Sequence, residues 1–153
     1  MERSEFFDKS SSIVNNYLQS IVFLDDRAYK PNADEAKPNN SFDALSITQS
    51  FAHSNKLCAV YQPQTIKDIE NLNIVGGKAD VIVLDWEINF PKVVEEGREE
   101  DDDDHQAGLY TKDIIKSILF DGEKLNESSK IIVVYTGDYA ILNNILTDIF
   151  ENV

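Results

Sequence analysis

The chain has 153 residues, of which 42% are hydrophobic, and its 28 acidic and 14 basic side chains give a net charge of −14. This length predicts one domain with a proper core, and the composition excludes a chain that is disordered throughout. The negative charge argues against non-specific binding of nucleic acid or of anionic membranes, and no stretch approaches the length of a transmembrane segment.

The first element that the sequence predicts is an amphipathic helix from Arg3 to Gln19. Its apolar residues repeat at seven and four, as one face of a helix does: Phe6, Phe7, Ile13, Val14, Tyr17 and Leu18. We expect a packing helix in residues 1–19, followed by the main domain in residues 20–153. The amino terminus has no secretory signal, and the lone Cys58 cannot form an internal disulfide. Both observations favour a soluble protein of the cytoplasm.

Strand and helix signals then alternate. Ile21 to Leu24 is an aliphatic run that predicts a strand, and Arg27 to Asn40 predicts a loop because it holds two prolines and three asparagines. Ser41 is the expected N-cap of the next helix, whose apolar residues are Phe42, Leu45, Ile47, Phe51 and Ala52. Leu57 to Tyr61 predicts the second strand.

The central strand lies within Ala79 to Ile88, after a predicted helix at Thr65 to Leu72 that leaves through Gly76 and Gly77. Its aliphatic run is typical of a strand that is buried on both faces of a parallel sheet, and the run ends on Asp85. An acidic insertion at about 89–108 follows, and its residues 95–104 hold eight acids and one arginine. This tract predicts a solvated loop, or a segment that concentrates divalent cations beside Asp85.

The last three elements complete the pattern. Leu109 to Phe120 predicts a helix that ends at Asp121 and Gly122, and Lys130 to Tyr135 predicts the fourth strand. Asp138 is the expected cap of a final helix with the apolar residues Ile141, Leu142, Ile145, Leu146, Ile149 and Phe150. This order predicts a doubly wound, mostly parallel α/β sheet with helices on both faces.

Acidic side chains follow two of the predicted strands. Asp25 and Asp26 follow the first strand and Asp85 ends the central one, and the carboxyl ends of parallel strands meet at one edge. Three carboxylates brought close together repel one another unless a cation joins them, and Mg²⁺ prefers oxygen ligands. A carboxylate beside Mg²⁺ can attack phosphorus in line, and Thr136 would bring a hydroxyl to the same edge. The pattern predicts a Mg²⁺ site at which a carboxylate could accept a phosphoryl group.

Three blocks of the chain resemble the receiver domains of bacterial two-component systems: Ile-Val-Phe-Leu-Asp-Asp at 21–26, Val-Ile-Val-Leu-Asp at 81–85 and Ile-Ile-Val-Val-Tyr-Thr-Gly at 131–137. The resemblance implies a flavodoxin-like fold with Asp85 as the phosphoacceptor. It also implies that Asp26 binds Mg²⁺ directly, that Asp25 acts through water and that the backbone carbonyl of Glu87 adds a metal ligand. Thr136 would be the switch hydroxyl. Such a protein is a phosphorelay switch more than an enzyme, and its partners are a sensor kinase and an output domain or effector.

The chain departs from this family in three places. Pro91 lies later after Asp85 than the family's proline, and the loop after Asp26 is longer than usual. The family's fifth strand, which carries a phosphoryl-binding lysine, is missing, so we expect the strand order 2-1-3-4 and no catalytic lysine in this chain. The uncovered edge of the fourth strand predicts that the natural polypeptide continues beyond Val153, or that a second copy or a partner covers this edge.

Two other functions stay open. A pseudo-receiver would keep the fold as a surface for protein interaction, while its altered loops block phosphotransfer. A Mg²⁺-dependent phosphohydrolase or nuclease would use Asp85 and Glu87, although no phosphate-binding glycine or lysine motif follows a strand. We assign no ligand role to His53, His105 or Cys58, and we expect Trp86 to be a packing residue.

Overall fold

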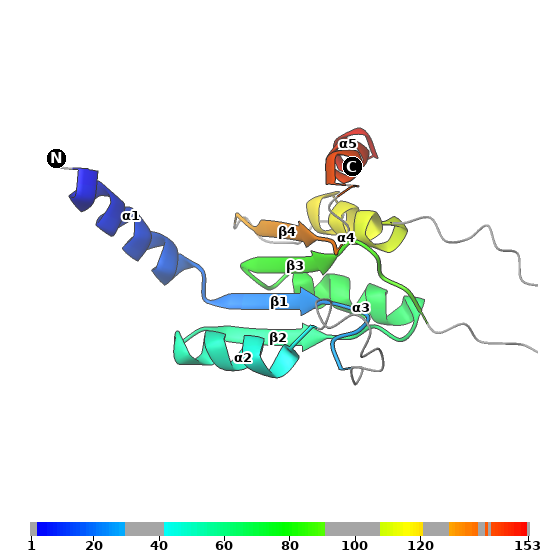
Figure 1. Cartoon of the computed structure of the whole chain (residues 1–153), viewed down its shortest axis with the longest axis horizontal. Helices are drawn as coiled ribbons and strands as arrows, with labels where there is room; N and C mark the ends of the chain where they lie inside the picture. The colour runs from blue at the N-terminus through cyan, green and yellow to red at the C-terminus, as the bar shows by residue number, and fades with distance from the viewer. Residues whose placement is uncertain are drawn as a thin grey trace, which may run out of the picture.

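The structure is a computed structural model that describes residues 3–29, 42–90, 108–120, 129–137, 140 and 142–152. Its elements in chain order are α1 (Arg3–Tyr17), β1 (Ser20–Leu24), α2 (Ala44–His53), β2 (Leu57–Tyr61), α3 (Ile66–Gly76), β3 (Val81–Asp85), α4 (Leu109–Phe120), β4 (Ile131–Tyr135) and α5 (Leu142–Asn152). Figure 1 shows the strands side by side with α1 extending away from them. The predicted alternation of strands and helices is confirmed.

The four strands form one parallel sheet in the order β2-β1-β3-β4, as predicted. All four arrows in Figure 1 point in the same direction, so the carboxyl ends of the strands meet at one edge. In the register between β3 and β4, Asp85 is opposite Tyr135. β4 is an edge strand, and no strand of the described segments pairs with its outer side.

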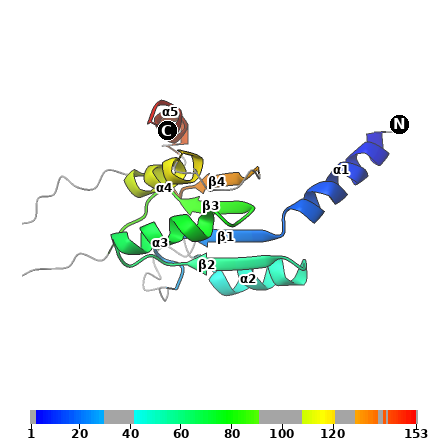
Figure 2. The same cartoon turned by 180° about the vertical axis from the view of Figure 1, so that it is seen from behind.

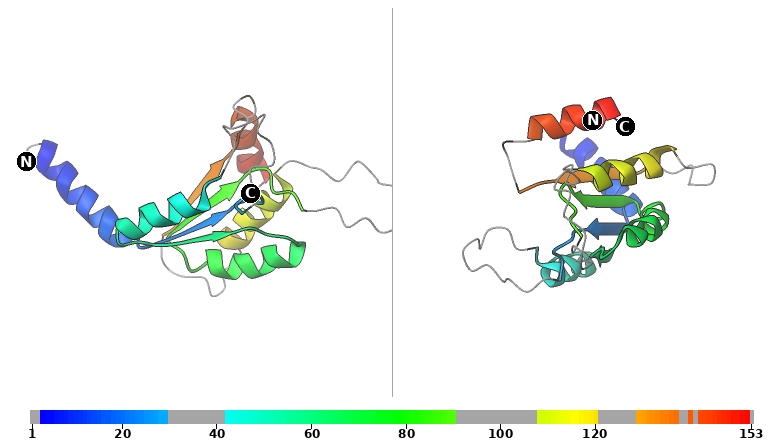
Figure 3. Two further views of the ribbon diagram at one scale, coloured as in Figure 1. Left: turned by 60° about the horizontal axis from the view of Figure 1, so that its bottom comes forward. Right: turned by 90° about the vertical axis from the view of Figure 1, so that its right-hand side faces the viewer.

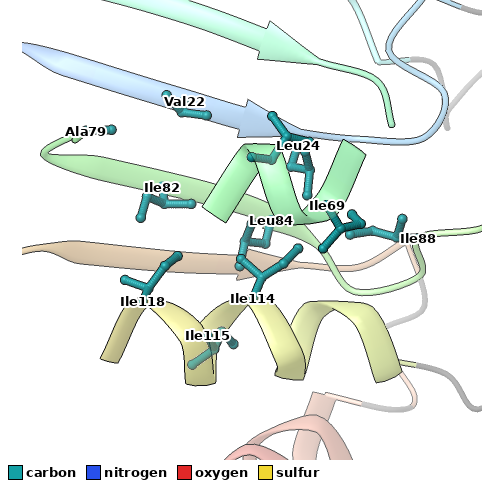
Figure 4. Close-up of a cluster of buried hydrophobic side chains, with 11 residues drawn as sticks. Val22, Leu24, Ile69, Ala79, Ile82, Leu84, Ile88, Ile114, Ile115 and Ile118 are labelled. Atoms are coloured by element: carbon teal, nitrogen blue, oxygen red, sulfur yellow. The ribbon is translucent and has the colours of Figure 1, made fainter. Parts of the chain in front are cut away.

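Helices cover both faces of the sheet, which confirms the doubly wound fold. Figure 2 shows α3 and α4 in front of the strands, whereas α2 lies on the opposite face, and Figure 3 shows the same layers from two further directions. The main core lies between the sheet and the pair α3 and α4 (Figure 4), and its buried residues include Val22, Leu24, Ile69, Leu72, Ile82, Leu84, Ile114, Ile115 and Ile118. This packing holds the carboxyl ends of β1 and β3 in place.

Three predicted helix boundaries are wrong, the first because the helix predicted from Arg3 to Gln19 ends at Tyr17. Asp43, not Ser41, caps α2, because its carboxylate accepts a hydrogen bond from the backbone nitrogen of Ser46 at 2.8 Å. The helix predicted at Thr65 to Leu72 continues to Gly76, because Gly76 lies buried against Ile82 and Ile118 in the same core. Several predictions lie outside the described residues, namely those on most of the loop 27–40, Ser41, Pro91, the tract 95–104, His105, Asp121, Gly122, Asp138 and Ile141.

The apolar face of α1 is exposed in this structure. Phe6, Phe7 and Ile13 expose 66%, 70% and 68% of their surface, although Tyr17 at the end of the helix donates a hydrogen bond to the backbone oxygen of Ser129 at 2.5 Å. The prediction that α1 packs on a surface therefore stays a prediction, because none of the described segments covers this face. None of the helices in the described residues has both the length and the apolar character needed to cross a membrane.

Candidate metal centre

Asp85 is the last residue of the central strand. Its side chain is 9% exposed, and both Leu84 before it and Trp86 after it are buried. The backbone nitrogen of Glu87 donates a hydrogen bond to Asp85 Oδ1 at 3.2 Å, which closes a tight turn directly after the strand. The sequence thus places a carboxylate at the carboxyl edge of the sheet, beneath a turn that holds it.

Asp25 and Asp26 follow β1, the strand next to β3. Their side chains are buried, with 4% and 3% of their surface exposed. Asp25 Oδ1 accepts a hydrogen bond from the backbone nitrogen of Arg27 at 2.6 Å, which is an Asx turn. The Arg27 Nε atom lies 3.7 Å from Asp26 Oδ1, at the exposed rim of the same turn. The chain therefore turns sharply here and keeps both carboxylates inside.

The three carboxylates converge. One oxygen atom from each of Asp25, Asp26 and Asp85 lies within 4.8 Å of the others. The pKa of Asp85 is raised to about 7, mainly by burial and also by the charges of Asp25 and Asp26, while the Glu87 amide and Arg27 act in the opposite direction. The protein thus holds a carboxyl group that gives up its proton only near neutral pH.

This set of ligands fits Mg²⁺. All three groups are carboxylates, which suit a hard cation, and the cluster includes neither imidazole nor thiolate. Burial is the largest cause of the raised pKa of Asp85, and repulsion by the charges of Asp25 and Asp26 adds to it, so a divalent ion at this position would stabilise the ionised carboxylates. The residues that are present could therefore hold the ion that the sequence predicts.

Tyr135 joins this cluster, and the sequence reasoning missed it. Its hydroxyl donates a hydrogen bond to Asp25 Oδ2 across the carboxyl end of the sheet. Burial raises the pKa of Tyr135, and so do the hydrogen bond to Asp25 and the neighbouring carboxylates, so the phenol keeps its proton. A polar aromatic residue at the end of an aliphatic run was the available signal, but only the strand register shows where its hydroxyl reaches.

The two other predicted site residues lie at the same edge. Thr136 directly follows β4 and is half-buried. The side chain of Glu87 is exposed, and its backbone carbonyl accepts a hydrogen bond from Asn89 Nδ2 at 3.2 Å. These positions agree with the roles that the sequence suggests but do not test them, so the switch hydroxyl and the carbonyl ligand stay predictions.

A second unpredicted contact fixes the backbone of Asp85. Thr111 in α4 is fully buried, and its hydroxyl donates a hydrogen bond to the backbone oxygen of Asp85 at 2.6 Å. Just before α4, Gly108 has a φ of +78° and lies against the ring of Trp86. The start of α4 is thus joined to the turn that carries the carboxylate, and no sequence pattern indicated this contact.

We expect the binding of Mg²⁺ to weaken as the pH falls through about 7, since the ion must then displace the proton of Asp85. The dissociation constant should rise about tenfold for each step of one in pH between pH 7 and pH 5, which corresponds to one displaced proton. The measurement is a Mg²⁺ titration at pH 8, 7, 6 and 5, followed by the fluorescence of Trp86. Asp85→Asn, which has no proton to displace at this position, should show a much flatter profile. Equal affinity of the wild-type chain at pH 8 and pH 5 would contradict this prediction.

The chain is similar to a known protein family. A family model described as a response receiver domain matches residues 17–153, which is nearly the whole chain. No curated protein and no solved structure matches. The matched residues include all four strands and the three clustered carboxylates.

Proposed function

This chain belongs to the response receiver domain family, and from that premise we propose that it is a phosphorelay signalling module whose phosphoacceptor is Asp85. The observation that carries the proposal is the buried cluster of Asp25, Asp26 and Asp85 at the carboxyl edge of the sheet. Burying three carboxylates without a cation is unfavourable, so their convergence indicates a site for a divalent ion beside a nucleophile.

In the proposed reaction an ionised oxygen of Asp85 attacks the phosphorus of a phosphodonor in line. A phosphorus–oxygen bond forms at Asp85, the bond from phosphorus to the leaving atom of the donor breaks, and that atom keeps the electron pair. Bound Mg²⁺ supplies positive charge that neutralises the phosphoryl oxygens. Because the pKa of Asp85 is about 7, this carboxylate is a stronger base than an ordinary one and is still ionised above neutral pH.

The surrounding residues have distinct proposed roles. Asp26 would contact the ion directly, Asp25 would act through water, and the backbone carbonyl of Glu87 would complete the protein's ligands. Thr136 donates its hydroxyl to the phosphoryl group after transfer and so reports phosphorylation to the end of β4. These assignments are supported by the positions of all four residues at one edge of the sheet.

Two described lysines have partners outside the cluster. Lys112 Nζ lies 2.9 Å from Asp148 Oδ2 and joins α4 to α5, and Lys130 Nζ donates to the backbone oxygen of Ala79 at the opposite end of the strands. Arg27 is the basic residue whose charge lowers the pKa of Asp85. It therefore offsets part of the negative charge that a phosphoryl group would add.

The partner in this proposal is a protein. A receiver passes its state to a kinase or an effector, and the outer edge of β4 is a surface on which such a partner could act. Ile131 and Val133 on this edge strand expose 44% and 41% of their surface, more than a buried strand of a parallel sheet normally does. A second copy of the chain, or a further strand of a longer polypeptide, would also cover this edge.

Beryllofluoride with Mg²⁺ tests the proposal, because it mimics a phosphoryl group on an aspartate. Trp86 is buried directly beside Asp85, so its fluorescence should change when beryllofluoride binds to the wild-type chain. The same additions should leave Asp85→Asn unchanged, whereas Asp113→Asn, an exposed position on α4, should respond like the wild type.

An unresponsive wild-type chain would contradict phosphoacceptance and would favour the pseudo-receiver, which keeps the fold for protein interaction alone. The phosphohydrolase or nuclease alternative gains no support, because the clustered carboxylates are Asp25, Asp26 and Asp85 and the side chain of Glu87 is exposed.

A further inference from the structure

We propose that Tyr135 is a positioning residue of this site, which holds the Asp25 carboxylate in the orientation that Mg²⁺ requires and couples ion binding to the end of β4. The inference rests on the proposed function, because it assumes that Asp25, Asp26 and Asp85 bind a divalent ion. It adds a residue from the fourth strand to a metal centre otherwise built from β1 and β3.

The two oxygens of Asp25 have separate donors. Oδ1 accepts from the backbone nitrogen of Arg27 at 2.6 Å, and Oδ2 accepts from the Tyr135 hydroxyl. The side chain of Asp25 is 4% exposed, so water cannot readily replace either donor. The carboxylate therefore cannot rotate without losing a hydrogen bond in a buried place, and its plane is fixed before any ion binds.

Tyr135 is itself held firmly. It is opposite Asp85 in the β3–β4 register, and its backbone oxygen accepts a hydrogen bond from the Trp86 nitrogen at 2.9 Å. The backbone of Tyr135 is thus joined to the residue after Asp85, while its hydroxyl is joined to Asp25. A shift of either aspartate on ion binding would therefore reach Tyr135 at the end of β4.

Such a donor matters more for Mg²⁺ than for Ca²⁺. Mg²⁺ requires a nearly ideal octahedral shell, whereas Ca²⁺ accepts longer and more variable arrangements of oxygens. In the proposed site Asp25 would reach the ion through a water molecule, and the loss of an outer-shell hydrogen bond that orients the groups around a metal typically weakens metal binding by about 10-fold to 100-fold. If Tyr135 orients Asp25, its hydroxyl should therefore contribute to the preference for Mg²⁺ as well as to the affinity.

The experiment compares Mg²⁺ and Ca²⁺ binding to the wild type and to Tyr135→Phe, by calorimetry and by Trp86 fluorescence at pH 8. We expect the Mg²⁺ dissociation constant of Tyr135→Phe to rise about tenfold, with a clearly smaller rise for Ca²⁺. Tyr29→Phe is the matched control, because it also removes a tyrosine hydroxyl that donates to an oxygen, here the backbone oxygen of Val60 at 3.1 Å. Tyr29→Phe should bind both ions like the wild type.

The outcomes separate this inference from the proposed function. If the wild type binds neither ion, both are overturned. If the wild type binds Mg²⁺ and Tyr135→Phe binds it equally well, or loses both ions to the same extent, only the role of Tyr135 is overturned. Should Tyr135→Phe fail to fold, the 3-fluorotyrosine ¹⁹F resonance of Tyr135 in the otherwise wild-type chain decides. It should shift when Mg²⁺ is added, and an unmoved resonance would overturn the inference.

Discussion

Gly108→Ala should lower the free energy of unfolding by about 3 kcal/mol, the sum of a strained backbone and an overpacked contact. Gly108 has a φ of +78°, and a Cβ built there would lie 2.1 Å from Trp86 Cζ2 and 2.4 Å from both Cε2 and Cη2. The Trp86 ring is 3% exposed, so it cannot move aside without disturbing the turn after Asp85. The measurement is urea denaturation followed by circular dichroism.

Gly76→Ala is the matched control for this prediction. A Cβ at Gly76 would lie 3.7 Å from Ile118 Cδ1 and from Ile82 Cδ1, which is ordinary van der Waals contact. Because Gly76 belongs to α3, alanine should leave stability unchanged or raise it by up to about 1 kcal/mol. A loss of less than about 1 kcal/mol in Gly108→Ala would contradict the predicted contact between Gly108 and Trp86.

Asp85→Asn should stabilise the ion-free protein by about 2–3 kcal/mol at pH 8, although it should abolish the response to beryllofluoride. The pKa of Asp85 in the folded chain is about 7, well above the ordinary aspartate value of 3.8. A carboxyl group whose pKa is higher in the folded chain than in the unfolded chain stabilises the fold at a pH below both pKa values. This stabilisation is lost as the pH rises through the pKa of the folded chain. A pKa that differs by one between the folded and unfolded chains corresponds to about 1.4 kcal/mol, and partial contact with solvent reduces the total.

The pH dependence makes this prediction specific. Near pH 4 Asp85 is protonated in the folded chain and resembles asparagine, so the two proteins should unfold at similar urea concentrations. In the presence of a chelator, the free energy of unfolding of Asp85→Asn should exceed that of the wild type by an amount that grows between pH 4 and pH 7. Mg²⁺ should reduce this difference, because it binds to and stabilises the wild type. Asp113→Asn should show no such pH-dependent difference in stability from the wild type. An Asp85→Asn protein less stable than the wild type at pH 8 would contradict the proposed repulsion within the cluster.

The sheet could be predicted from the sequence because its two central strands, β1 and β3, are largely buried and its two edge strands are also short aliphatic runs. A strand covered on both faces must be a short aliphatic run, and all four runs lead directly into polar residues at their carboxyl ends. Asp25, Asp26 and Asp85 were therefore predictable as neighbours, since the edge of a parallel sheet brings such residues together. The order of the strands followed from the resemblance rather than from any pattern of residues.

Contacts that depend on register or on a single rotamer could not be predicted. Tyr135 ends a strand like any edge residue, and only its place opposite Asp85 lets its hydroxyl reach Asp25. Thr111 lies in the first turn of α4, a helix that was predicted from its isoleucines. Nothing in that pattern predicted the hydrogen bond from Thr111 to the Asp85 backbone. The cap of α2 was misplaced for a related reason: serine and aspartate both cap helices, and the sequence alone did not decide between Ser41 and Asp43.

The pairing of the strands also bears on how the chain reaches this fold. Residue 21 pairs with residue 81, and residue 81 pairs with residue 131, so no two neighbouring strands are joined by a short hairpin. Closing such long loops costs conformational entropy before any sheet contact is gained, which slows folding more than it lowers equilibrium stability. The acidic tract lengthens the loop between β3 and β4, yet doubling a loop costs only about 0.6 kcal/mol. An insertion at this position should therefore slow folding far more than it lowers the stability of the native state.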